Sequence, residues 1–487
     1  MNKAQAKDFV SLRLCNNAAG EISFFNFYFG LRRVVMYQIM KRLRVALFFL
    51  LVCTEPQLVM AGEPWENIAN SPERLHRTIK AITDIMVHDI YSPPVASRIY
   101  AYTTVAAYEA ALTPLEIQQS FSGRLNDLAD SQRPSLQVGL NHPLASVHAT
   151  LLVARSLIIS EQQLDAVHAM ILKEFSTSGM PDTVFKNSLV YGRQVADWIL
   201  QWAAQDRYKQ TRSLAKYAVR NDAASWRPTP PAYMKAVEPN WGKLRTFLID
   251  SAQLFRPPLP TPFSTDTASQ FYREARAVQE AGMKLTTQQI EIANFWDCNP
   301  FKLNVNGHVM YATKKISPGG HWINITALAC KQSNSGFTKS AAAYAVLSIA
   351  LADAFISCWE EKFRSKLIRP ETYINQHISQ GWMPLLQTPP FPEYTSGHSV
   401  VSAAAAVILG SFFGDDFAFD DSTELEFKIP VRHFTSFKQA AEEAAISRFY
   451  GGIHYMPSIV NGLGEGEKLG VYVADRLIHK GPYLEKN

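Results

Sequence analysis

The sequence is poor in cysteine. Five of its 487 residues are cysteine, and only Cys298, Cys330 and Cys358 follow residue 61. An odd number excludes a complete disulfide framework, and these three lack the paired close spacing that is typical of a zinc site. We therefore expect them to be small buried residues.

The chain also has no general excess of charge. Its formal net charge is +5, but residues 1–61 hold eight Lys or Arg and three acidic residues, which leaves 40 of each sign in the remainder. A chain that is neutral outside one end gives no support for binding a polyanion. We expect no nucleic-acid partner.

Residues 1–61 have the pattern of an export signal. Basic residues within 41–44 precede an unbroken apolar run at 45–52, and Val59-Met60-Ala61 has the small-x-small form of a cleavage site. We expect an over-long N-terminus, cleavage near Ala61 and export to the periplasm or the medium. The apolar run is shorter than the roughly 20 residues that span a bilayer, so we expect no stable membrane insertion.

Helical periodicity dominates the remaining sequence, which has no internal repeat and no glycine-rich nucleotide loop. One helical face is formed by Leu75, Ile79, Ile82, Met86 and Ile90. The other expected helices are 98–112, 144–159, 161–175, 184–204, 290–296, 340–363, 396–413, 436–450 and 462–478. Ser160 and the capping boxes Thr286–Gln289 and Ser436–Gln439 mark three helix starts. Only 423–429 alternates like a strand.

These patterns predict an all-α fold of two packed helical bundles with at most a small β-hairpin. Eight prolines punctuate 206–264, where no period is sustained. Its aromatic residues Trp226, Tyr233, Trp241, Phe247 and Phe255 indicate a connection that packs on the surface. The expected organisation is 1–61, an over-long N-terminus and signal; 62–205, an N-terminal bundle; 206–264, the connection; and 265–487, a C-terminal oxyanion-binding domain.

Three short blocks in the C-terminal part bring chemically active side chains together. The first is Lys362 with Arg369-Pro370 after six residues, the second is 391–398, and the third is Ser447-Arg448 with His454 after five residues. Each block alone is ordinary, because such charges are usually solvated and Ser-Gly-His is usually a turn. Their order within 93 residues indicates one site.

The blocks suit a tetrahedral oxyanion. A buried multiply charged anion needs cations in place of water, and Lys362, Arg369 and Arg448 supply three. We expect Pro370 to end a helix at Arg369. Ser396-Gly397 opens the next helix, where backbone N–H groups and a hydroxyl meet the anion.

Two histidines can then act on the bound anion. One can attack or coordinate its central atom, and the other can transfer protons. His398 lies at the N-terminus of the helix that Ser396 opens, beside cations, and suits proton transfer. His454 follows the turn Gly451-Gly452, which can direct it back towards the anion.

The three blocks resemble the signature of the vanadium-dependent haloperoxidase and type 2 phosphatidic acid phosphatase superfamily: K-x6-R-P, P-S-G-H and S-R-x5-H-x3-D. The resemblance covers roughly residues 295–470. It implies that vanadate, or phosphate in a phosphatase, is held by Lys362, Arg369, Ser396, Gly397 and Arg448. It also implies that His454 is the axial vanadium ligand or the phosphate nucleophile, that His398 is the acid/base group, and that Lys362 polarises bound peroxide.

The sequence departs from this signature at two positions. Thr395 replaces a proline, which alters local stiffness. Ser458 stands where the family has an Asp that orients the axial histidine, so the basicity of His454 is in doubt. In the segment before the signature, Asp297 is a candidate partner of Arg448 and His321 a candidate pocket residue; both also suit a purely structural role.

The signature is shared by peroxidases and phosphatases, so other features decide between them. Trp359 and Phe391 stand where haloperoxidases carry aromatic residues around the halide, which favours a vanadate-dependent haloperoxidase acting on hydrogen peroxide and halide. Ala405 replaces a histidine of bromoperoxidases. An exported acid phosphatase is the alternative, and Ser458 alone supports a non-catalytic phosphate-binding protein. A homo-oligomer is left open.

Overall fold

A computed structural model of the protein describes residues 65–306 and 308–479. The expected signal and its cleavage position lie outside the described residues. The described residues fall in one compact unit and are mostly helical, which confirms the all-α fold. Among them are two short antiparallel hairpins rather than one. The domain boundaries expected at 205 and 265 stay a prediction.

The first group of helices follows the predicted pattern closely. Its members are α2 Trp65–Asn70, α3 Glu73–His88, α4 Pro93–Ala111, α5 His142–Leu157, α6 Glu161–Ser176, α7 Asp182–Ala203 and α8 Tyr208–Ser213. In α3 the predicted face is buried, but the helix ends before Ile90, whose φ of 57° is left-handed. Ser160 precedes α6 without capping it, because its hydroxyl donates to Asp89 at 2.5 Å. Helix α4 is buried along its whole length.

The proline-rich connection packs against the helices, as expected from its aromatic residues. Trp226, Trp241 and Phe247 are buried, whereas Tyr233 is 63% exposed. The backbone N–H groups of residues 247–249 donate to the buried carboxylate of Asp353, which lies in α12. A carboxylate that accepts three backbone bonds fixes the connection to the core.

The chain then forms the elements that surround the site. They are α9 Gln270–Met283, α10 Thr287–Phe295, β1 Leu303–Asn306, β2 Val309–Ala312, α11 Pro318–Gln332, α12 Phe337–Ser365, α13 Pro370–His377, α14 Gly397–Phe413, β3 Phe419–Asp421, β4 Arg432–Phe434, α15 Phe437–Tyr450 and α16 Met456–Ala474. The capping box at Thr286 is confirmed, and Ser436 accepts from the backbone of Gln439 at the start of α15. The strand predicted at 423–429 is wrong: a 3-10 turn, Leu425–Phe427, lies there, with β3 and β4 on either side.

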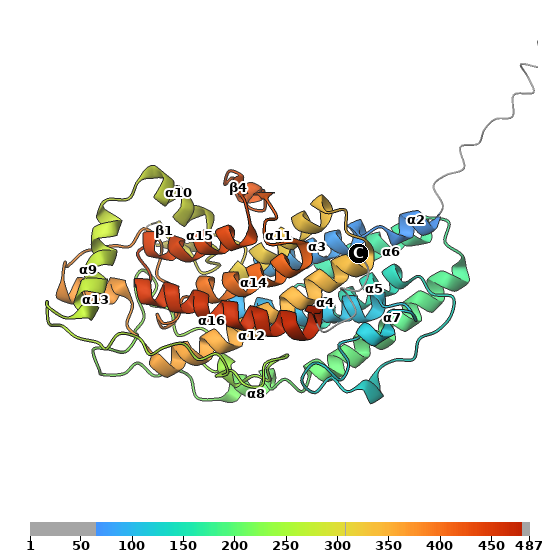
Figure 1. The fold of residues 1–487 in the computed structure, drawn as a ribbon, viewed down its shortest axis with the longest axis horizontal. Coiled ribbons are helices and arrows are strands. Elements are labelled where there is room, and N and C mark those ends of the chain that lie inside the picture. The colour runs from blue at the N-terminus through green and yellow to red at the C-terminus, as the bar shows by residue number, and fades with distance from the viewer. Residues whose placement is uncertain (1–64, 307, 480–487) are drawn as a thin grey trace, which may run out of the picture. The chain divides into compact units, whose positions relative to one another are not determined.

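Helices α12, α14 and α16 lie side by side, and α4 packs on α12 (Figure 1). Small residues permit this approach: a Cβ at Gly466 of α16 would lie 2.1 Å from the carbonyl oxygen of Val400 in α14. By length and composition α12 could cross a membrane, but its most apolar stretch is fully buried inside the protein. The same burial is typical of a core helix.

Candidate active site

The three sequence blocks meet at the ends of four helices. Lys362 lies in the last turn of α12, Arg369 caps the start of α13, Arg448 lies in the last turn of α15, and Ser396 caps α14. The expected end of a helix at Arg369 is wrong. Helix α12 stops at Ser365, because Lys366 adopts a left-handed φ of 53°, and Pro370 instead begins α13. Proline is well suited to the first helical position.

Lys362 is fully buried, and it donates to backbone carbonyl groups. Its Nζ lies 3.1 Å from the oxygen of Pro392 and 3.0 Å from that of Glu393, and it also bonds to that of Thr395. Burial lowers the pKa of Lys362 to about 8. The lysine therefore orders the loop before α14 and places a positive charge behind it.

The two arginines are buried in the same way. Arg369 donates through Nε to the carbonyl of Phe391 and through Nη1 to that of Ile453, both at 2.9 Å. Its Nη2 is buried without a hydrogen-bond partner. Arg448 donates through Nη2 to the carbonyl of Trp296 at 2.7 Å. Burial lowers the pKa of Arg369 to about 10 and also lowers that of Arg448.

No carboxylate of the described residues forms an ion pair with Lys362, Arg369 or Arg448. Carbonyl dipoles satisfy most of their N–H groups, and the carboxylates Glu393 and Asp297 act on these charges only from a longer range than an ion pair. Buried charge that is only partly compensated is costly, and an incoming anion would stabilise it. Asp297, the predicted partner of Arg448, pairs instead with Lys315 at 2.9 Å and with Lys302 at 3.3 Å.

His454 is held in a defined tautomer between Glu393 and Arg369. Its Nδ1 lies 2.7 Å from Oε1 of Glu393, and its Nε2 lies 3.1 Å from Nη1 of Arg369. A carboxylate accepts and a guanidinium only donates, so Nδ1 carries the proton and Nε2 presents a lone pair. Burial and then Arg369 lower the pKa of His454 well below its ordinary value.

Glu393 is the functional residue that the sequence interpretation missed. It takes the place expected of Ser458, whose hydroxyl lies 3.4 Å from Nδ1 of His454. Glu393 also accepts from the backbone N–H of Tyr455 at 3.0 Å. Burial raises its pKa to about 7, against the opposing effect of Arg369 and Lys362. Glu393 stands inside block 391–398, but its partner is 61 residues away and no local pattern joins the two.

The tautomer of His398 is fixed by one hydrogen-bond acceptor. Its Nε2 lies 2.9 Å from the carbonyl oxygen of Trp296, the same oxygen that accepts from Arg448. A carbonyl only accepts, so Nε2 carries the proton and Nδ1 is unprotonated. Burial and then Arg448 lower the pKa of His398 well below its ordinary value. The imidazole is therefore neutral near pH 7 and able to accept a proton.

A small cavity of about 40 Å³ lies where these groups meet. Its lining includes Trp359, Phe391, Gly397, His398, Arg448 and His454. Gly397 lines the cavity at the start of α14, where a Cβ would be in van der Waals contact with the Trp359 ring at 3.7 Å. Lys362, Arg369 and Ser396 lie behind this lining; Nζ of Lys362 is 5.3 Å from the centre of the Phe391 ring.

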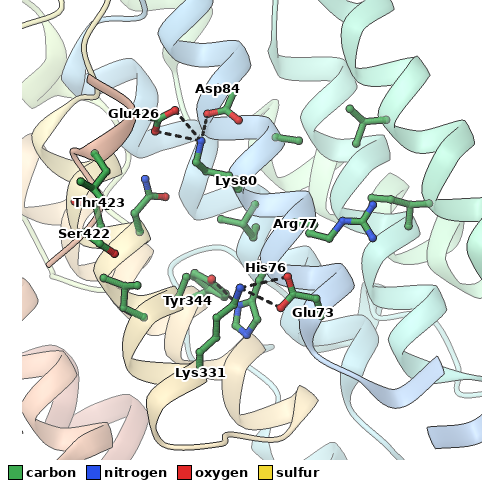
Figure 2. Close-up of a pocket in the computed structure, with 18 of the residues that line it drawn as sticks. Glu73, His76, Arg77, Lys80, Asp84, Lys331, Tyr344, Ser422, Thr423 and Glu426 are labelled. Carbon is green, nitrogen blue, oxygen red and sulfur yellow. Dashed lines mark hydrogen bonds and ion pairs between the residues drawn. The ribbon is translucent and has the colours of Figure 1, made fainter. Parts of the chain in front are cut away.

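A larger cavity, of about 620 Å³, lies between α3 and α11 (Figure 2). Its polar side chains are engaged with one another: Lys80 pairs with Asp84 and Glu426, and Lys331 pairs with Glu73. The larger of the two cavities is therefore not the one that holds the candidate catalytic side chains. None of the three sequence blocks contributes to this cavity.

Comparisons with known proteins agree with this geometry. A family model described as the VCPO second helical-bundle domain matches residues 342–480. A crystal structure described as the first bacterial vanadium-dependent iodoperoxidase has 47% sequence identity and a TM-score of 0.78, and the match covers 84% of this chain and 97% of that one. A holo-type bacterial vanadium-dependent chloroperoxidase has 16% identity and a TM-score of 0.59, covering 80% and 93%. Comparison with curated protein sequences finds no match.

Proposed function

Because this chain belongs to the vanadium-dependent haloperoxidase family, we propose that it uses hydrogen peroxide to oxidise iodide at a vanadate held in the cavity between α12 and α15. The structure with 47% identity is described as an iodoperoxidase. This description supports iodide as the substrate rather than chloride, which demands a stronger oxidant. The balanced reaction takes one halide, one hydrogen peroxide and one proton to hypohalous acid and water.

The observation that carries the proposal is the set of buried cations without carboxylate partners. Lys362, Arg369 and Arg448 suit a trianionic oxyanion, and the partnerless Nη2 of Arg369 is a donor that such an ion would satisfy. The cavity of about 40 Å³ has room for a small ion rather than an organic cofactor. Bound vanadate supplies a Lewis-acidic centre that activates peroxide.

His454 is the proposed ligand of vanadium. Nδ1–H donates to Glu393, so Nε2 is the nitrogen that would coordinate vanadium, in place of its contact with Nη1 of Arg369. A carboxylate behind a metal-binding histidine fixes the ring and raises its basicity. Glu393 thus supplies the negative charge that Ser458 lacks, which removes the one argument for a non-catalytic phosphate-binding protein.

His398 is the proposed acid/base residue. Its bare Nδ1 can accept the proton that hydrogen peroxide loses on binding and return it to the departing oxygen. Lys362 and the arginines stabilise negative charge on the oxygens. Ser396 and Gly397 contribute the start of α14, and the rings of Trp359 and Phe391 form the apolar wall beside which halide would approach.

One pair of assays tests this function. Oxidation of iodide, bromide and chloride by hydrogen peroxide is measured with and without vanadate, and hydrolysis of p-nitrophenyl phosphate is measured without it. We expect vanadate-dependent iodide oxidation. The proposal fails if halides are not oxidised and the phosphate ester is hydrolysed in a reaction that vanadate blocks.

His454→Ala should abolish the iodide oxidation, and His433→Ala is its matched control. His433 is an exposed histidine of β4 that pairs with Asp420 and lies outside the cavity. Equal turnover in both variants would contradict the assignment of the vanadium ligand. Export of the mature chain after cleavage near Ala61, without membrane insertion, is proposed from the pattern of residues 1–61 alone.

A further inference from the structure

Three side chains from distant segments converge beside the active-site cavity. Cys298 follows α10, His321 lies in the first turn of α11, and Glu424 follows β3. Their Sγ, imidazole nitrogen and carboxylate oxygen atoms lie within 4.8 Å of one another, and all three residues are buried. Thiolate, imidazole and carboxylate are the ligand types of protein-bound zinc.

The orientation of His321 is fixed by a fourth residue. Its Nε2 lies 2.8 Å from Oδ2 of Asp421, a carboxylate that also accepts from the backbone and hydroxyl of Thr423. Asp421 therefore holds the proton on Nε2 and turns Nδ1 towards Cys298 and Glu424. A carboxylate behind a histidine in this way is the usual second partner of a metal-binding imidazole.

The distances around Nδ1 suit two ligands of one ion better than a hydrogen bond to Glu424. Nδ1 lies 3.4 Å from Sγ of Cys298 and 3.4 Å from Oε1 of Glu424. Donors on one tetrahedral zinc ion lie roughly 3.4–3.6 Å apart, given bonds of about 2.0–2.3 Å. An N–H···O bond is usually no longer than about 3.2 Å.

Glu424 supplies an independent sign that something is missing. It is 3% exposed, and its Oε1, the atom that faces His321, has no hydrogen-bond partner. A buried carboxylate oxygen without a partner is costly, and a cation at this point would satisfy it.

We propose that Cys298, His321 and Glu424 bind a divalent cation of the zinc type, with Asp421 as the positioning carboxylate and a fourth coordination position left for water. Binding displaces the thiol proton of Cys298, which passes to solvent. This site is separate from the vanadate cavity, although Cys298 lies in the wall between them.

The alternative occupant of the cluster is a proton. Burial opposes a charge on His321, but Asp421 and Cys298 raise its pKa well above the ordinary value, so an imidazolium could join the two carboxylates without a metal. The two arrangements differ in one measurable property. Only the arrangement with a bound cation retains a stoichiometric metal ion.

The cluster would stabilise the backbone that holds the active site. The Trp296 ring stacks on His321 with centroids 4.6 Å apart, and the Trp296 carbonyl accepts from both His398 and Arg448. A metal ion that links Cys298 to α11 would therefore restrain the turn on which these two residues depend.

Metal content tests the proposal directly. The full chain is stripped with a chelator, incubated with zinc alone, freed of excess by gel filtration and analysed by mass spectrometry. We expect one zinc ion per chain, and retention of less than a tenth of an equivalent would overturn the proposal. Cobalt is then bound in place of zinc, and a thiolate charge-transfer band is expected.

Matched variants locate the ion. Cys298→Ser should weaken zinc binding at least ~tenfold, whereas Cys330→Ser, which changes another buried thiol outside the cluster, should not. Glu424→Gln keeps the shape of the side chain and provides a second variant should Cys298→Ser fail to fold. His454→Ala should still bind zinc, because it alters only the vanadate cavity. Unchanged zinc binding in both cluster variants would contradict the assignment.

Discussion

Buried cations are treated differently in the two halves of this protein. Among the N-terminal helices, Arg98 of α4 is paired with the carboxylate of Asp206, and Arg133 is paired with Glu109 of α4. Near the cavity, Lys362, Arg369 and Arg448 are more deeply buried than Arg98 or the partly buried Arg133, and they donate to carbonyl groups. Both solutions satisfy most N–H groups, and only the first places a carboxylate in direct contact with the cation.

The difference separates structural cations from functional ones. A buried ion pair is internally balanced and leaves little field for a ligand, whereas a cation held by dipoles keeps its field. Two carboxylates lie near the cavity. Asp297 pairs with two lysines outside the three sequence blocks, and Glu393 engages His454. The C-terminal half thus pays in stability for a site that an oxyanion completes.

The sharpest way to break this comparison is Arg369→Met, which keeps an unbranched apolar stem and removes the charged guanidinium. We expect vanadate-dependent iodide oxidation to fall by about 10³-fold, because a preorganised cation is lost. The free energy of unfolding should change less than in a variant that breaks a balanced pair. Activity titrated with vanadate and urea denaturation measure the two effects. A loss of stability in Arg369→Met with unchanged vanadate binding would contradict the assignment of Arg369 as an anion-binding residue.

Asp206→Asn tests the other half. It leaves Arg98 buried without its carboxylate, and we expect the free energy of unfolding to fall by about 3–5 kcal/mol. Vanadate affinity of the folded chain should not change. Lys186→Ala, which breaks an exposed pair with Asp182, is the control and should leave the denaturation midpoint unaltered. An equal loss in both variants would show that burial of the pair does not matter.

Glu393→Gln tests the role of the carboxylate that accepts from His454. We expect vanadate to bind about 10–100-fold more weakly, as for other partners of a metal-binding histidine. Glu467→Gln, at an exposed position of α16, should bind vanadate normally. Addition of Ser458→Asp to Glu393→Gln should restore part of the affinity, because it returns a carboxylate to the signature position. Tighter binding after loss of Glu393 would mean that it merely opposes the anion.

The grouping of the candidate site residues could be predicted from the sequence because these residues stand in short local blocks. Arg448 and the two histidines line one cavity, and Lys362 and Arg369 lie behind its lining, close together as their spacing indicated. The helices were predictable for a similar reason, since α3 carries its apolar period, and α10 its capping box, within one segment.

Features that depend on distant partners could not be predicted. The pairing of Glu393 with His454 joins residues 61 apart, and Asp297 finds lysines rather than the expected arginine. The end of α12 depends on the left-handed Lys366, for which the sequence carries no signal as clear as a glycine. Cys298, His321 and Glu424 lack any local metal-site spacing and meet only through the fold.

The smallest effect is expected for Ser458→Ala, and it decides which residue orients the histidine. The Ser458 hydroxyl lies 3.4 Å from Nδ1 of His454, beyond an ordinary hydrogen bond, whereas Glu393 lies at 2.7 Å. Removal of the hydroxyl should therefore change vanadate affinity by less than about threefold, near the lower limit of a single weak contact. A loss as large as that of Glu393→Gln, measured in the same titration, would return the orienting role to position 458 and leave Glu393 as a loop residue.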